Sequence, residues 1–125
     1  MSIAALEYVG GLMARLDIPY AFMRKNEKPG AGYYFVGEYI ENTMTTKEEN
    51  GRQDTTFILR GFTRKDWLLL EEAKAKIEKN ASCTAILKDG TGIAVSYDGA
   101  TVVPTGDAEL KSIKINLTIR EWRVN

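Results

Sequence analysis

The side chains that most often perform chemistry in enzymes are scarce in this chain. It has 125 residues, no histidine and a single cysteine, Cys83. Without histidine, the sequence excludes a Ser–His or Cys–His catalytic pair and an imidazole metal ligand. One cysteine excludes an internal disulfide and a CxxC redox motif. We expect Cys83, near the start of a predicted strand, to be a small, partly buried residue without a reactive role.

The remaining candidates for acid–base, metal or phosphate chemistry lack the necessary spacing. Glu48-Glu49 and Glu71-Glu72 are pairs of adjacent residues. Adjacent side chains point to opposite faces of a strand and lie about 100° apart on a helix, so neither pair shares a proton. Gly90-Thr91-Gly92 lacks the third glycine of a dinucleotide-binding loop. The sequence therefore predicts no catalytic residue, no metal site and no cofactor, and the expected protein is not an enzyme.

The charge balance indicates which partners the protein is able to bind. The chain has 17 basic and 17 acidic side chains and a net charge of +0, which argues against broad capture of nucleic acid or of an acidic membrane. Basic residues gather near the C-terminus around Lys114 and Arg120, but acidic residues such as Glu121 are interspersed among them. We expect no specific nucleic acid partner and no membrane partner. The sequence shows neither a signal-peptide pattern nor a long apolar run, which favours a cytoplasmic protein.

Length and hydrophobic periodicity predict the fold. The chain suits a single domain over residues 1–125, and its 44% hydrophobic and 27% charged content is typical of a folded protein. The predicted class is α+β, a mostly antiparallel sheet with a long β-hairpin and two helices packed on the sheet. Apolar periodicity predicts helices over residues 2–16 and 63–80, and strands over residues 20–23, 32–42, 54–62, 83–103 and 110–124.

Dipeptides of asparagine or aspartate followed by glycine predict tight turns. Asn50-Gly51 is a favoured dipeptide for a two-residue hairpin turn, and a turn there pairs residues whose numbers sum to 101. Asp89-Gly90 and Asp98-Gly99 are predicted to form the two turns of a β-meander within residues 83–103. Gly10-Gly11, inside the first helix, is either a tolerated defect or a place where another backbone approaches closely. The hairpin register predicts three opposite-charge pairs, Glu49/Arg52, Lys47/Asp54 and Glu41/Arg60.

The tip of this hairpin is polar on both faces over residues 43–53, so we expect it to protrude from the core. It is either a mobile surface hairpin or an arm that packs against a neighbouring subunit, for example by adding a strand to that subunit's sheet. On the last strand, Trp122 shares the polar side with Arg120, which suits a contact surface; alternatively, Trp122 folds back onto the edge of the domain. The candidate subunit-interface residues are Lys47, Glu49, Asn50, Gly51, Arg52, Lys114, Arg120 and Trp122.

The order of these elements resembles a family of phage proteins. A helix containing Ala5-Leu6-Glu7-Tyr8 precedes Ile18-Pro19-Tyr20, a strand over residues 55–62 leads into the second helix, and the chain closes on the strand that begins at Ile113. This layout is similar to the small tail-terminator, tail-completion and minor capsid proteins of tailed phages and prophages. The resemblance implies a structural subunit without enzymatic activity that assembles as a homo-oligomeric ring and contacts other tail or head–tail proteins. It also implies a cytoplasmic protein during assembly and a virion component afterwards.

A group of aromatic residues leaves a second function open. Aromatic side chains that line a concave site often hold small ligands, which suggests a ligand-binding α+β sensor domain. The same residues could serve only to fill the core. They are Tyr20, Phe22, Tyr33, Tyr34 and Phe35.

Overall fold

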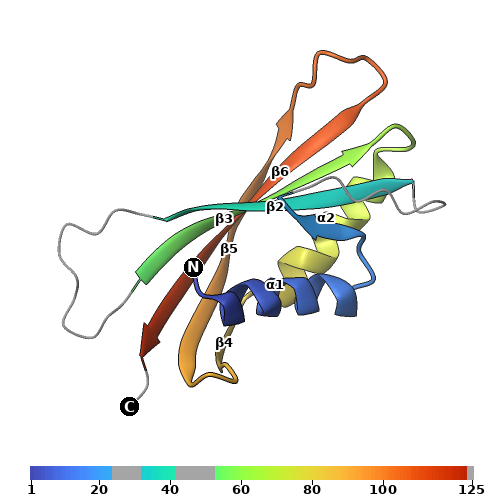
Figure 1. Ribbon diagram of the computed structural model, residues 1–125. Helices are drawn as coiled ribbons and strands as arrows, with labels where there is room; N and C mark the ends of the chain where they lie inside the picture. Colours follow the sequence, from blue (N-terminus) through green and yellow to red (C-terminus); the bar gives the residue numbers. More distant parts are fainter. Residues whose placement is uncertain (24–31, 42–52, 124–125) are drawn as a thin grey trace.

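The computed structural model describes residues 1–23, 32–41 and 53–123 (Figure 1). A six-stranded sheet has the order β1-β2-β3-β6-β5-β4, in which β1 and β2 are parallel and all other neighbours are antiparallel. The predicted class, α+β with a mostly antiparallel sheet and two helices, is confirmed. The elements are α1 (Ile3–Arg15), β1 (Tyr20–Phe22), β2 (Tyr33–Glu41), β3 (Gln53–Thr63), α2 (Leu68–Ala81), β4 (Cys83–Ile86), β5 (Thr91–Val103) and β6 (Lys111–Arg123).

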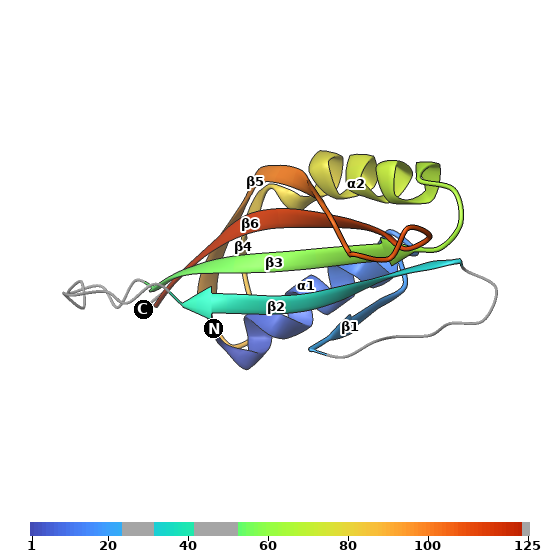
Figure 2. The same ribbon diagram turned by 90° about the horizontal axis from the view of Figure 1, so that it is seen from above.

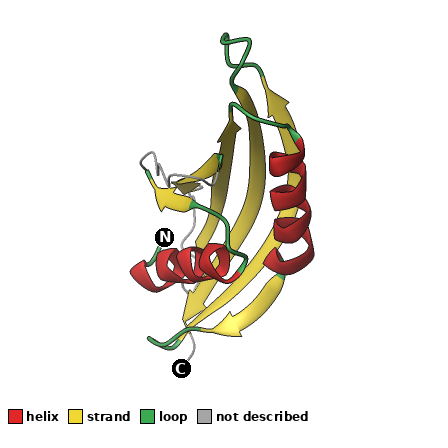
Figure 3. Ribbon diagram, turned by 90° about the vertical axis from the view of Figure 1, so that its right-hand side faces the viewer, coloured by secondary structure: helices red, strands yellow, loops and turns green. Residues whose placement is uncertain are grey.

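Both helices lie on the same side of the curled sheet (Figure 3). Side chains alternate between the two faces of a strand, and the predicted alternation of β6 is observed, since Ile113, Ile115, Leu117 and Ile119 are all buried beneath the helices. A single apolar core joins these side chains to those of α1, α2 and the neighbouring strands. Seen from above in Figure 2, β2, β3 and β6 run alongside one another, with β1 beyond β2.

The predicted start is correct for one helix and wrong for the other. The first starts as predicted, because the side chain of Ser2 accepts a hydrogen bond from the Ala5 amide at 3.1 Å and caps the helix. The predicted start of the second helix at Thr63 is wrong. Thr63 is buried in β3 opposite Lys111, and its hydroxyl accepts from the Lys65 amide at 3.1 Å. Continued pairing with β6 therefore outweighs the capping signal, and α2 begins five residues later, at Leu68.

The predicted hairpin register is also wrong. In the ladder between β2 and β3, Tyr33 lies opposite Thr63 and Glu41 opposite Thr55, so paired numbers sum to 96 rather than 101. Glu41 therefore does not face Arg60, and the Asn50-Gly51 turn itself lies outside the described residues. A glycine fits the observed register. Gly61 stands opposite Phe35, and a Cβ on Gly61 would lie 2.5 Å from the Phe35 ring, so the ring covers space that only glycine leaves open.

The second Asp-Gly pair of the predicted meander does not turn the chain. Asp89-Gly90 does form a turn between β4 and β5, whereas β5 continues through Asp98-Gly99 and pairs with β6 on both sides of that point. The ladder shifts by one residue between Tyr97 and Gly99, which defines a β-bulge. Gly99 has a φ of 132°, a conformation that glycine adopts easily. Turns and bulges both favour glycine for this reason, so the Asp-Gly pair suits either one.

The Gly10-Gly11 pair in α1 is a tolerated defect. Among residues 1–23, 32–41 and 53–123, a Cβ on either glycine would meet nothing within 4 Å. No backbone in the described part of the chain approaches these two positions closely, so the alternative finds no support there.

Candidate functional site

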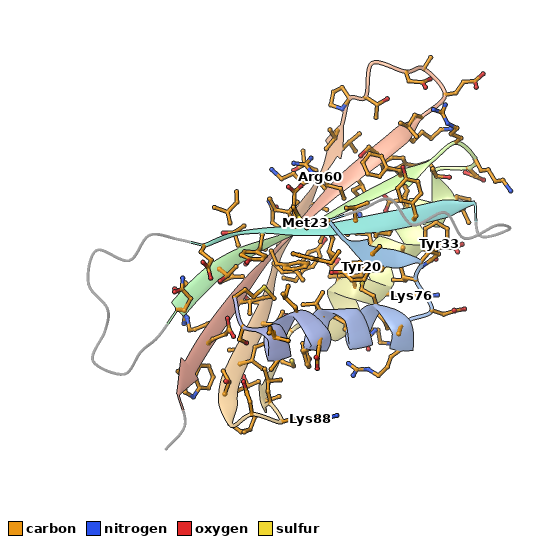
Figure 4. All side chains as sticks on the ribbon, viewed as in Figure 1. Tyr20, Met23, Tyr33, Arg60, Lys76 and Lys88 are labelled. Atoms are coloured by element: carbon orange, nitrogen blue, oxygen red, sulfur yellow. The ribbon has the colours of Figure 1, made fainter. Side chains whose placement is uncertain are left out.

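The sheet has one face that neither helix covers, which we call the helix-free face. Alternation along each strand assigns its residues: the core side chains of β3 and β6 have odd numbers, so the even-numbered side chains point to the helix-free face. In Figure 4, Arg60 lies on one side of β2 and Tyr20 on the other, toward α1. The helix-free face of β6 carries Lys114, Asn116, Thr118, Arg120 and Trp122.

Three of the predicted interface residues lie on this face, but they do not form one cluster. Arg120 and Trp122 are neighbours on the same side of β6. Lys114 lies six positions earlier on the strand, about 20 Å away along the chain, between Arg60 of β3 and Thr101 of β5. The other predicted interface residues, Lys47, Glu49, Asn50, Gly51 and Arg52, lie outside the described residues.

Charged side chains on this face pair across strands, although not with the partners predicted from the hairpin. The Arg120 Nε donates to Asp54 Oδ1 at 3.1 Å, which links β6 to β3. Arg60 donates to Glu38 of β2, in place of the predicted Glu41. The predicted Lys47/Asp54 and Glu49/Arg52 pairs each involve a residue outside the described part. Local charge pairing is thus observed, and it joins three strands of the sheet rather than one ribbon.

Trp122 packs against its own domain. It lies opposite Gly92 of β5, and a Cβ on Gly92 would clash with the indole ring. The ring therefore covers the glycine, and Trp122 is half-buried. Of the two interpretations of this residue, the side chain folded back onto the edge of the domain describes what is seen.

A shallow hollow of about 360 Å³ lies beside Arg120 on β4, β5 and β6. Apart from Arg120, the side chains that line this hollow are small or medium-sized. Cys83 borders it, and the Cys83 Sγ lies 2.5 Å from the hydroxyl oxygen of Tyr8. Burial and this contact with Cys83 raise the pKa of Tyr8. As predicted, Cys83 is partly buried. The lining residues are Ser82, Cys83, Thr84, Ala94, Val95, Ser96, Thr118 and Arg120.

Sequence reasoning missed an open strand edge at the far end of β5. Strand β4 pairs only with the first part of β5, from Gly92 to Val95. Beyond the bulge, residues 99–103 pair with β6 on one side, and no described strand pairs with them on the other. We call residues 98–103 the open edge of β5. The interpretation of Asp98-Gly99 as a turn concealed this edge, because it divided β5 into two short strands.

An apolar groove of about 500 Å³ lies next to the open edge, between the start of α2 and the loop that joins β5 to β6. Its walls include Trp67, Val102, Pro104 and Leu110. Hydrogen bonds hold the loop in shape, since the Thr105 hydroxyl donates to the Leu110 carbonyl at 2.8 Å. The groove therefore has a formed wall on the loop side.

Asp107 organises the tip of the same loop. Its carboxylate accepts from the Glu109 amide at 3.0 Å and from Arg64 Nη1 at 2.9 Å. The hydrogen bond from the Glu109 amide, followed by that from Arg64, lowers the pKa of Asp107. The carboxylate is therefore engaged within the domain, on the rim of the groove.

The aromatic group that suggested ligand binding is divided between the two faces of the sheet. Phe22 stacks on Tyr39 and Phe57 with ring centroids 5.9 and 6.3 Å apart, and Phe35 is fully buried in the core. Tyr34 stacks on Phe62 at 5.3 Å on the opposite face. These rings do not converge on one cavity, so their positions give the ligand-binding hypothesis no support.

Metal-binding clusters and membrane-spanning helices are both missing from the described part of the chain. Within residues 1–23, 32–41 and 53–123, no three or more Cys, Asp or Glu residues gather where they could hold a metal ion. In the same ranges, neither helix has the length and apolar character needed to cross a membrane.

Comparison with known proteins shows the fold and no family. No protein-family model matches the chain, and no curated protein matches its sequence. The chain is similar in structure to a protein in the virion of a native gene transfer agent particle, with a TM-score of 0.63 and 14% identity over 89% of this chain and 84% of that one. A second solved structure, without a descriptive name, has a TM-score of 0.59 and 13% identity over 93% of this chain and 87% of that one. The α+β fold described above is thus one that also occurs in a virion protein.

Proposed function

We propose that this chain is a structural assembly protein of a phage or prophage particle, and that it acts as a ring-forming tail-terminator or head–tail joining subunit. The observation that carries this proposal is the shared fold with a protein of a gene transfer agent virion, which extends over 89% of this chain and 84% of that one. Agreement over nearly the whole of both chains indicates the same domain rather than a shared fragment. The element order predicted from the sequence led to the same class of protein independently.

The chemistry of the helix-free face supports a structural role. Its charged side chains are used in pairs that link strands, Arg120 with Asp54 and Arg60 with Glu38. Such pairs hold a surface in shape and leave the exposed backbone and apolar positions for contacts. In this role the chain would work without enzymatic activity, in the cytoplasm during assembly and in the virion afterwards.

The partners follow from the same role. They are other copies of the chain in a ring and the adjoining tail or head–tail proteins of the particle. The predicted arm over residues 43–53, with Lys47, Glu49, Asn50, Gly51 and Arg52, belongs to this proposal as a contact between subunits. Lys114, Arg120 and Trp122 belong to it as residues on or beside the contact surface.

Deletion of the gene tests this function. Particles made without the protein are expected to fail at one step, giving separate heads and tails or tails without a finished end in negative-stain electron micrographs. A plasmid copy of the gene should restore intact particles. Intact, infectious or DNA-transferring particles at the normal number in the deletion strain would contradict the proposal.

A further inference from the structure

We propose that the open edge of β5, residues 98–103, accepts a β-strand from a second copy of this chain. The inference deepens the proposed function, on which it rests, by naming the interface that would join neighbouring subunits of a ring. Strand addition of this kind uses main-chain hydrogen bonds for affinity and the adjacent side chains for fit.

The hydrogen bonds at the start of β5 show which of its backbone groups point outward. The Thr91 carbonyl accepts from the Leu87 amide at 2.8 Å, and the Tyr97 amide donates to Ser82 Oγ at 3.3 Å. Odd-numbered residues before the bulge therefore direct their backbone groups toward β4. The bulge adds one residue to β5 and reverses this assignment for the rest of the strand.

Beyond the bulge, Gly99, Thr101 and Val103 turn toward β6, opposite its even-numbered residues. The N–H and C=O groups of Ala100 and Val102 therefore point away from β6. Within the described part of the chain these groups have no strand partner. In Figure 1, β5 continues beside β6 to the loop at the top, whereas β4 lies at the lower end of the sheet.

The bulge, Asp98 and Pro104 flank the open edge, and the five residues between Asp98 and Pro104 carry none of the side chains that usually protect a strand from pairing. Proteins block exposed edges with charged side chains, proline, β-bulges or very short strands. The stretch from Gly99 to Val103 contains no charged residue and no proline. Val102 is 65% exposed, and its side chain forms part of the apolar groove beside Trp67 and Pro104. An added strand would place alternate side chains over this groove.

The opposite end of the same sheet offers the complementary edge, which is why we assign the partner as a second copy. Strand β1 covers β2 only at Phe35–Gly37, so Glu38–Glu41 has no described strand on that side. Its two carboxylates are engaged within the chain, Glu38 by Arg60 and Glu41 by the amino group of Met1. The Phe35 amide donates to the Pro19 carbonyl and the Gly37 carbonyl accepts from the Met23 amide, both at 2.8 Å. Odd-numbered residues of β2 therefore face outward, which includes Glu41.

Two different edges at opposite ends of one sheet create a head-to-tail contact. Each copy would accept a strand at β5 and offer one at β2. Contacts between two different surfaces of the same chain generate closed rings or open filaments rather than simple two-fold dimers. The pairing of the two edges therefore matches the assembly that the proposed function requires.

Proline substitutions test the two edges separately. Ala100→Pro and Glu41→Pro each remove an outward N–H and leave the ladder to the inner neighbour intact. Ala100→Ser and Glu41→Gln keep the N–H and serve as matched controls. By sedimentation velocity, the wild type and both controls are expected to form oligomers. Each proline variant is expected to sediment as a monomer at the same concentration, with the far-ultraviolet circular dichroism spectrum of the wild type.

A mixture of the two proline variants gives the decisive test. Each variant retains the edge that the other has lost, so an equimolar mixture is expected to form a dimer that cannot grow further. A mixture that stays monomeric, proline variants that oligomerise like the wild type, or a wild type that remains monomeric at its highest soluble concentration would each overturn the proposal. The proposal would also be wrong if the wild type were monomeric and the Ala100→Pro variant were nevertheless missing from particles. The open edge would then bind a different protein.

These outcomes are separate from the test of the proposed function. If the gene is needed for particle assembly but oligomers form regardless of the proline substitutions, the edge inference fails and the structural role stands. If particles form normally without the gene, the structural role fails whatever the edges do.

Discussion

Gly61→Val is expected to destabilise the fold by about 3 kcal/mol, because the added side chain must enter space that the Phe35 ring occupies. Gly61 is buried between β2 and β6, opposite Phe35 on one side and Ile113 on the other. A Cβ there would lie 2.5 and 2.6 Å from two atoms of the Phe35 ring and 3.0 Å from Ile113. The ring cannot move away without disturbing a fully buried core. Urea unfolding of the variant and the wild type measures the loss.

Two further variants separate crowding from a general effect of replacing glycine. Gly11→Ala adds a Cβ that no described residue approaches within 4 Å, and it is expected to stabilise α1 by about 1 kcal/mol. Phe35→Leu shortens the opposing side chain, so Gly61→Val should cost at least about 1 kcal/mol less in that background. Equal costs of Gly61→Val in both backgrounds would show that crowding against the Phe35 ring is not the cause of the lost stability.

Glu121→Ala is expected to cost about 2–3 kcal/mol. Glu121 is only 6% exposed, although it is charged. Its carboxylate accepts from the Ser2 amide at 3.3 Å and from the Ser2 hydroxyl at 2.5 Å, at the N-terminus of α1. A negative charge is favourable there, because the free amides of the first turn give that end of the helix partial positive charge. Alanine would leave the Ser2 groups without this partner and loosen α1 from β6.

Thermal and urea unfolding measure this loss, with two controls. Glu121→Gln keeps an acceptor but removes the charge and should cost about half as much. Glu109→Ala alters a solvent-exposed carboxylate in the loop before β6 and should change stability by less than about 0.5 kcal/mol. An alanine variant at position 121 that is as stable as the Glu109→Ala control would show that the Ser2 contacts contribute nothing.

Hydrophobic periodicity was sufficient to predict most of the elements. The ends of α1 and β6 lie within a residue or so of the predicted ones, because both have clear apolar stripes and Ser2 is an effective cap. The start of α2 was harder to predict, because it lies five residues after the predicted one. Thr63 has the character of a helix cap, but its position opposite Lys111 in the ladder keeps it extended, and only the tertiary structure reveals that competition.

Local turn preferences were the main source of error. Asn50-Gly51 and Asp98-Gly99 both favour turns in short peptides. In the observed register of β2 and β3, an aromatic ring lies over a strand glycine, Phe35 over Gly61, and this contact joins residues far apart in sequence. At Asp98-Gly99 the same glycine conformation serves a bulge, since pairing with β6 continues beyond it.

Only part of the candidate site could be predicted from sequence. Alternation along β6 correctly placed Lys114, Arg120 and Trp122 on one face. It could not show that Lys114 stands apart from the other two, or that Trp122 covers Gly92 on the neighbouring strand. The open edge of β5 depends on where β4 ends, and strand length in a sheet is decided by its neighbours rather than by the strand's own residues.

Quantitative mass spectrometry of purified particles tests the proposed structural role most directly. Particles released by the organism that encodes this chain would be banded by density and their proteins measured against labelled peptides. A structural role predicts that this chain is present in every preparation at a fixed, small number of copies per particle, in constant ratio to the other virion proteins. Its absence from intact particles, or a ratio that falls steadily with further purification, would contradict that role.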